Sequence, residues 1–384
     1  MPDENPYSHP GVSFSLLQSL TTPNIWQITA LAFGHAGHLY AGSDNGDLRV
    51  YDLSSFKVIR AVKGNGKTIS AIVCMKRPGT EFRDAWVTSG KQILKYRLDT
   101  PKLVQTYDDA LETVTVVSDE DDDDDEVQDL ALNWEKTHLA FGTDSGSVGV
   151  IDLSSKTVVK LKTKHDVMCG SVEWIPERPR ELVSGGCDAI LLHTDIVRDE
   201  VISKQNLASL SAQEGQIAMS PPFIMSLSIA SNGIVAAGTA DGKLWLGFGG
   251  EKIPSASKTK KKSKWGGLDL EQASVVSVAE APIVAVAFHS PTQLTLSTLK
   301  GAITHYNLIY GNDTGAVVYQ AVWHRQCENM IKVNALIVDE KRIVVGGYRT
   351  VSVYQFKDCP SLHDQLSKKC LCSLYQIISS DVSN

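Results

Sequence analysis

The sequence has no long apolar run: its hydrophobic stretches have the length of strands, so we expect no transmembrane helix. Its first residues, MPDENPYSHPG, carry two acids and are not followed by an apolar segment, so we expect no secretory signal. A glycine-rich phosphate loop, a His-Glu-x-x-His helix and a nucleophile elbow are also missing. The ten histidines are dispersed. We therefore predict that the protein is not an enzyme and uses no cofactor.

Closely spaced cysteines are rare in this sequence. Seven cysteines are scattered along the chain, and only Cys370 and Cys372 stand near each other. No second cysteine–histidine pair lies beside them to complete a metal tetrad, so we predict no metal site. Without a secretory signal, reduced thiols in the cytoplasm or nucleus are the expected state.

One segment makes the chain acidic. The formal net charge is −7, and without the eight consecutive acids from Asp119 to Glu126 it would be +1. The simplest interpretation is a solvated loop. The functional alternative is an electrostatic lure for a basic partner, with Asp119, Asp122 and Asp125 as contact residues.

Two long stretches of the chain align without a gap: ITALAFGHAGHLYAGSDNGDLRVYDLSSFKVIRAV at 28–62 and VQDLALNWEKTHLAFGTDSGSVGVIDLSSKTVVKL at 127–161. Both contain Asp-Leu-Ser-Ser before a final strand-like segment. Both also place a glycine, Gly46 or Gly146, in a turn where a positive φ is needed. Each stretch reads as four short strands, nearly apolar on both faces, as in a sheet that is covered on both sides.

The same order of short strands and turns occurs seven times along the chain, with less similarity between the sequences. The predicted first strands begin near residues 28, 69, 127, 169, 224, 283 and 333. The shortest intervals match the roughly 40–45 residues of a four-stranded propeller blade. The longer intervals contain an acidic loop at 118–126, a polar insertion at 203–220 and a basic loop at 254–267.

The chain therefore resembles the WD-repeat β-propeller family over residues 13–356. We predict an all-β fold with seven blades, an N-terminal arm at 1–12 and a C-terminal tail at 357–384. The seventh unit ends after its third strand at Phe356. We expect residues 13–20 to supply its missing strand, which would close the ring and hide the edges of that blade. We expect the tail to be frayed.

The units depart from the family's pattern in two ways. None contains the Trp-Asp dipeptide of the family, and Gly34-His35 is only a poor match to the family's Gly-His signature. The dipeptides that stand in place of Trp-Asp are Tyr51-Asp52, Ile151-Asp152 and Thr194-Asp195. His35 and His165 still lie where a propeller uses histidine for structural hydrogen bonds, and we predict that role for both. An enzyme would instead need an acid–histidine constellation at the central opening.

The resemblance implies a non-catalytic scaffold that binds other proteins. The stretch from the acidic loop to the fourth unit resembles WD-repeat proteins that are grouped with substrate-receptor candidates of cullin-four ubiquitin ligases. Such receptors commonly dock an adaptor through Trp-Asp-x-Arg at the end of a blade's third strand. Here Ser54 and Ser154 occupy the arginine position, whereas Arg198 lies one place late. Arg198 is thus the residue to test for adaptor binding.

An alternative function is that of a nuclear factor in ribosome assembly or chromatin work that uses the acidic and basic loops. Lys260, Lys261 and Lys262 could form a nuclear-import patch or contact phosphates, although a solvated loop is the simplest interpretation. Trp265 is the only aromatic residue of this loop, so direct nucleic-acid binding is not expected. We expect a monomer within a complex, in the cytoplasm, the nucleus or both, with no membrane partner.

Overall fold

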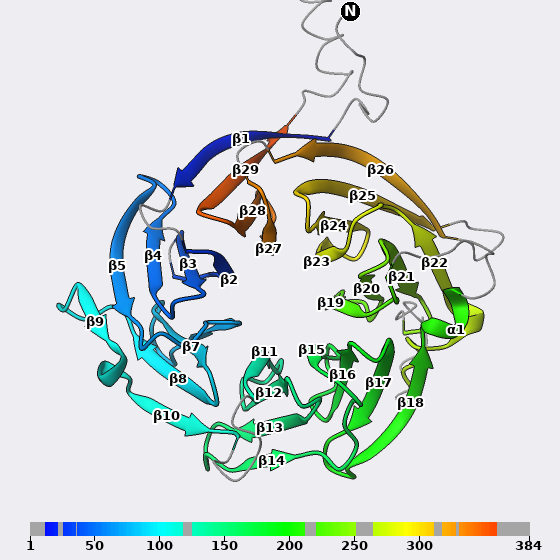
Figure 1. The fold of residues 1–384 in the computed structure, drawn as a ribbon, viewed down its shortest axis with the longest axis horizontal. Helices are drawn as coiled ribbons and strands as arrows, with labels where there is room; N and C mark the ends of the chain where they lie inside the picture. Colours follow the sequence, from blue (N-terminus) through cyan, green and yellow to red (C-terminus); the bar gives the residue numbers. More distant parts are fainter. Residues whose placement is uncertain are drawn as a thin grey trace, which may run out of the picture.

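Seven β-sheets surround a central axis and form a closed ring (Figure 1). The computed structural model describes residues 12–21, 26–35, 37–117, 125–211, 220–250, 264–310, 317–327 and 330–358. Over these residues the only helical elements are one turn of helix, α1 (Ala208–Ser211), and two 3-10 turns, Tyr107–Asp109 and Leu270–Gln272. The predicted all-β, seven-bladed β-propeller is confirmed.

Each blade is one sheet whose strands follow one another from the axis to the rim. Blade 1 consists of β2 (Ile28–Phe33), β3 (His38–Ser43), β4 (Leu48–Asp52), β5 (Lys57–Lys63) and β9 (Val104–Thr106), and blade 2 of β6 (Ile72–Lys76), β7 (Arg83–Ser89), β8 (Gln92–Arg97) and β10 (Glu112–Thr115). Blade 3 consists of β11 (Val127–Leu132), β12 (His138–Thr143), β13 (Val148–Asp152) and β14 (Val158–Lys160), and blade 4 of β15 (Cys169–Trp174), β16 (Glu181–Gly186), β17 (Ile190–Asp195) and β18 (Glu200–Asn206). Blade 5 consists of β19 (Ile224–Ile229), β20 (Val235–Thr239), β21 (Lys243–Gly247) and β22 (Ala273–Ser277), and blade 6 of β23 (Ile283–Ser290), β24 (Gln293–Thr298), β25 (Ala302–Tyr310) and β26 (Val317–Gln326). Blade 7 consists of β27 (Val333–Val338), β28 (Arg342–Gly347), β29 (Thr350–Asp358) and β1 (Val12–Thr21).

The second strand of each blade is buried along most of its length, because neighbouring blades cover both of its faces. In β12 the last five residues, Leu139 to Thr143, are all buried. Glycine allows the next blade to come close: a Cβ placed on Gly42 would lie 2.5 Å from Cγ2 of Ile69, at the start of blade 2. Small and apolar residues in these strands therefore set the spacing between blades.

The ring is closed by the N-terminal strand, as predicted. Strand β1 pairs antiparallel with β29, from Val12 opposite Asp358 to Thr21 opposite Thr350. Phe14 of β1 is only 6% exposed and anchors the pair. Closure thus joins two segments from opposite ends of the sequence and covers the outer edge of blade 7.

Some details differ from the sequence-based expectations. The first strand of blade 2 begins at Ile72 rather than near 69, and β9 adds to blade 1 a fifth strand, parallel to β5, that was not predicted. The polar insertion was expected from 203, but β18 continues to Asn206. The basic loop lies within blade 5, between β21 and β22, rather than between blades 5 and 6. The expected arm and tail lie outside the described residues, apart from Val12 and the last residues of β29.

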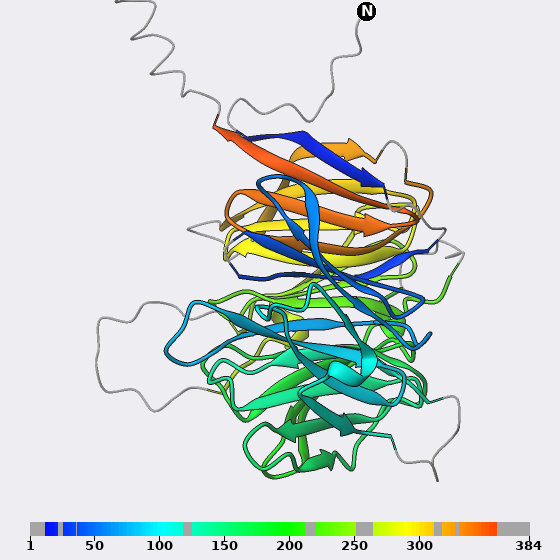
Figure 2. The same cartoon turned by 90° about the vertical axis from the view of Figure 1, so that its left-hand side faces the viewer.

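Connections between strands alternate between the two faces of the disc, which Figure 2 shows edge-on. We call "lower" the face that carries the turns from first to second and from third to fourth strand. The "upper" face carries the second-to-third turns and the links between blades. Val117, just before the acidic segment, and Asp125, near its end, belong to a link between blades and thus to the upper face. Gly250, before the basic loop, and Lys264, near its end, belong to a third-to-fourth connection and thus to the lower face.

Candidate functional site

Six inner strands border the central opening in the same way. In β2, β11, β15, β19, β23 and β27 the pairing with the second strand slips by one residue after the first pair, which is a β-bulge. The extra residues all border the opening, a cavity of about 500 Å³; they are Thr29, Gln128, Gly170, Met225, Val284 and Asn334. The bulges therefore decide which side chains reach the axis.

Two acidic side chains of adjacent blades border the same cavity. Asp129 accepts hydrogen bonds from the backbone N–H groups of Leu130 and Val172, both at 2.9 Å. Burial raises the pKa of Asp129 to about 6. Burial, together with the charge of Asp129, raises the pKa of Glu173 to about 8. Among the described residues that border the opening there is no histidine, cysteine, lysine or arginine, so they contain no acid–histidine pair for catalysis.

His165 has the structural role predicted for it. Its ring is fully buried at the upper face, with Nδ1 3.0 Å from Oδ1 of Asp188 and Nε2 2.9 Å from Oγ of Ser184. Burial raises the pKa of Asp188, but the hydrogen bond and charge of His165 outweigh it, and the pKa is lowered. His35 differs, because its ring packs against Phe82 at the lower face, with centroids 4.9 Å apart.

A groove at the lower face separates blades 1 and 2, and we call it the blade 1–2 groove. It holds about 380 Å³ and is lined by residues of β3, β4, β5 and β7, by the turns before β3 and β7, and by the segment that follows β8. Tyr40 and Leu98 form its apolar base, and both are buried. Arg60 and Arg83 bring positive charge to its walls.

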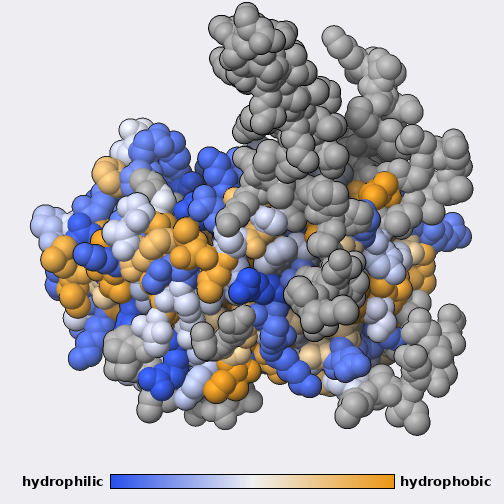
Figure 3. Space-filling model, turned by 90° about the horizontal axis from the view of Figure 1, so that it is seen from above, coloured by the Kyte–Doolittle hydropathy of each residue, from blue (hydrophilic) through white to orange (hydrophobic). Residues whose placement is uncertain are grey.

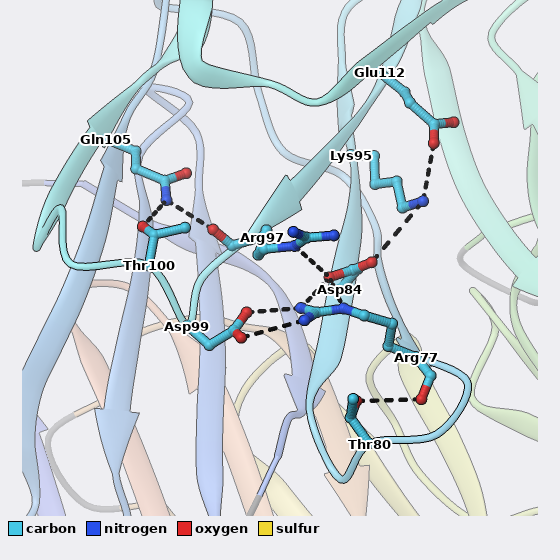
Figure 4. Close-up of polar contacts among 9 residues, drawn as sticks. All are labelled: Arg77, Thr80, Asp84, Lys95, Arg97, Asp99, Thr100, Gln105 and Glu112. Carbon is cyan, nitrogen blue, oxygen red and sulfur yellow. Dashed lines mark hydrogen bonds and ion pairs between the residues drawn. The ribbon is translucent and has the colours of Figure 1, made fainter.

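An ion-pair network in blade 2 holds one wall of the blade 1–2 groove (Figure 4). At its centre Asp84, with 4% of its side chain exposed, accepts from Nη2 of Arg77 at 2.8 Å. The same guanidinium donates to both oxygens of Asp99, at 2.7 and 3.3 Å. These hydrogen bonds lower the pKa of Asp99. Lys95 and Arg97 approach Asp84 at 3.9 Å, so three cations surround one buried carboxylate.

The network continues to blade 3. Lys95 pairs with Glu112 of β10 at 2.9 Å, and Glu112 also pairs with Lys156 from the β13–β14 turn. The two ammonium groups lie 5.4 and 5.2 Å from the ring centre of Trp86, which is fully buried. The lower edge of blade 2 is thereby tied to the next blade and kept in place beside the groove.

Two of the predicted partner-contact residues lie in the described part of the chain. Arg198 lies in the lower-face turn between β17 and β18, with 74% of its side chain exposed and Nε 3.9 Å from Asp195. Asp125 is only 4% exposed, and its carboxylate accepts from the N–H and the Oγ of Ser145 at 2.8 and 2.9 Å. Its carboxylate therefore holds an upper-face turn. The other predicted contact residues, Asp119, Asp122, Lys260, Lys261 and Lys262, lie outside the described part of the chain.

Trp265 is buried between two blades, which its place in the basic loop did not predict. Its ring is 4% exposed, its Nε1 donates to the carbonyl of Gly233 at 2.9 Å, and it meets the ring of His193 edge-on. It therefore packs between blades 4 and 5. The blade 1–2 groove also escaped sequence reasoning, because its residues come from segments whose proximity only the assembled blades create.

No family model matches the sequence. Among the described residues, no group of three or more histidine, cysteine, aspartate or glutamate side chains could hold a metal ion. In the same part of the chain, no helix has the length and apolar character needed to cross a membrane. Figure 3, which looks at the rim over the closing strand, shows hydrophobic and hydrophilic residues side by side.

Proposed function

We propose that the protein is a non-catalytic scaffold that binds other proteins through the faces of its propeller. The closure of the ring by β1 and β29 carries this proposal. A closed ring holds its loops on a stiff frame, so a partner is bound with little loss of conformational entropy. The described lining of the central opening contains no acid–histidine pair, and the ion pairs of Arg77 with Asp84 and of Lys95 with Glu112 hold the structure of blade 2.

The specific form that we propose is a substrate receptor of a cullin-four ubiquitin ligase, with Arg198 in contact with the adaptor. Residues 121–192 and the ending at 351–356 resemble WD repeat-containing protein fifty-three of animals, which is grouped with such receptors. The position of Arg198 supports the proposal, because its side chain is largely exposed at the lower face. Asp195 keeps the turn in shape by accepting from the N–H groups of Val197 and Arg198 at 2.9 and 3.1 Å.

Co-purification tests this form directly. The tagged wild-type protein and its Arg198→Glu variant are isolated from cells, and the cullin-four adaptor is quantified in each. The matched control is Arg180→Glu, an exposed arginine at the lower face of the same blade. We expect loss of the adaptor with Arg198→Glu alone. Equal recovery with all three proteins would remove Arg198 from the proposed interface, whereas absence of the adaptor from the wild-type sample would reject the ligase role.

The alternative of a nuclear factor is supported by one observation. The residues that flank the acidic and basic segments belong to opposite faces, so two partners of opposite charge would not compete for one face. Replacing Lys260, Lys261 and Lys262 with glutamine and imaging the tagged protein tests it. Unchanged nuclear entry together with unchanged RNA association would contradict this alternative.

A further inference from the structure

We propose that the blade 1–2 groove is a docking site for a peptide segment of a partner protein that carries a bulky apolar side chain next to carboxylates. This inference rests on the proposed scaffold function and assigns a site and a partner chemistry to it. It is independent of Arg198, which lies in blade 4.

Apolar groups lie open at the rim of this groove. Leu103 is 61% exposed and Phe82 is 42% exposed, although both border a cavity whose base is formed by the buried residues Tyr40 and Leu98. Leu103 is held in place because its carbonyl accepts from the N–H of Ala61 at 3.1 Å, just before β9 joins blade 1. A leucine or phenylalanine side chain that enters the groove would therefore find apolar contacts on a preformed surface.

The charge that the groove offers to a ligand is positive. Nη1 of Arg60 is buried and has no hydrogen-bond partner within the described structure. Arg83 uses one nitrogen, Nη1, to donate to the carbonyl of Phe33 at 3.3 Å. The one carboxylate among the lining residues, Asp99, already receives two hydrogen bonds from Arg77. A ligand carboxylate in the groove would be attracted by the positive charge of Arg60 and Arg83.

The position of the groove favours a separate partner over the acidic segment of this chain. The groove lies at the lower face, whereas Val117, just before the acidic segment, and Asp125, near its end, belong to the upper face. A basic segment is disfavoured because Arg60 and Arg83 would repel it. A wholly apolar segment would leave the positive charge of Arg60 and Arg83 without a counter-charge.

Fluorescence anisotropy with synthetic peptides tests the inference on the intact protein. The probe is a labelled Gly-Glu-Glu-Leu-Phe-Glu-Glu-Gly peptide, and the comparison peptide has lysine at each glutamate. The groove variants are Arg60→Met, which keeps the apolar stem, and Leu103→Asp at an exposed position. Matched controls at the upper face are Lys332→Glu and Ile331→Asp, two exposed residues before β27. Circular dichroism confirms that each variant is folded.

We expect saturable binding of the acidic probe, about tenfold weaker binding to each groove variant, and unchanged binding to both controls. The lysine peptide should not bind. Absence of binding to the wild type, or equal binding to wild type and groove variants, would overturn the inference. Either result would leave the scaffold function intact if the protein still co-purifies with partners from cells, so the two proposals fail separately.

Discussion

Replacing Phe14 with alanine should loosen the closure of the ring. The side chain is 6% exposed and meets the rings of Trp323, His305 and Phe356 at centroid distances of 5.2, 5.3 and 5.4 Å. Trp323 and His305 belong to blade 6 and Phe356 to blade 7, so Phe14 fixes the closing strand to two blades. Truncating a buried phenylalanine costs about 3–5 kcal/mol, against a usual total stability of roughly 5–15 kcal/mol.

The measurement is urea unfolding followed by far-UV circular dichroism, together with limited proteolysis at the native state. The matched control is Leu17→Ala on the same strand, a residue that is 44% exposed beside the bulge of β1. We expect a loss of less than about 1 kcal/mol for the control. We also expect early cleavage near β1 in Phe14→Ala only, because the weakened strand detaches before the blades unfold. If the two variants unfold and are cleaved alike, Phe14 does not anchor the closure as argued.

Two further predictions concern charged groups. Asp84→Asn should lower the free energy of unfolding by about 2–3 kcal/mol, somewhat less than for a fully buried pair because Arg77 keeps Asp99 as a partner. Urea unfolding measures this loss. The control Glu81→Gln breaks an exposed ion pair with Lys76 and should leave the unfolding midpoint unchanged. An equal shift of the midpoint in the two variants would refute the role of the network. Glu173→Gln should stabilise the protein at pH 9 by up to about 5 kcal/mol, because it removes a carboxyl whose pKa is about 8 in the folded protein and 4.5 in the unfolded chain, and it should leave the stability unchanged at pH 4. The pKa of Glu173 is about 8 in the folded wild type, whereas the carboxyl of the unfolded chain has a pKa of 4.5. The stability of the wild type therefore falls as the pH rises between these two values. Parallel profiles of stability against pH for the two proteins would contradict this prediction.

The number of blades and the closing strand could be predicted because both depend on local patterns. The first three strands of every blade follow one another along the chain, so each blade leaves a recognisable unit in the sequence. The missing fourth strand of the last unit pointed to residues 13–20, and β1 spans Val12–Thr21. Buried small residues such as Gly42 recur because every second strand meets the same crowded environment between blades.

Features that depend on irregular insertions could not be predicted. Strand β9 has three residues and its pairing with β5 is parallel, so no turn signal announces it. Blade 5 receives its fourth strand only after the basic segment, which hides the regular spacing. The length of an insertion does not show whether the strand that follows it belongs to the same blade or to the next one.

The candidate sites were the least accessible to sequence reasoning, because they combine residues of different blades. Asp129 and Glu173 both border the central opening although they belong to separate blades. Arg60 and Phe82 line one groove for the same reason. Asp125 looked like one of many equivalent acids, yet it alone among the three acids predicted as contacts is placed by the structure, with its carboxylate bonded to Ser145.

The pairing of β1 with β29 has a consequence for biosynthesis. Val12 leaves the ribosome 346 residues before Asp358, its partner in the ladder. At about 5–20 residues per second, the early segment must remain unpaired for roughly 20–70 s. During that interval the nascent chain presents a free strand and an incomplete arc of blades to its surroundings. Chaperone demand should therefore be greatest just before β29 emerges from the ribosome, and truncation within the last blade should give aggregates instead of a shorter stable protein.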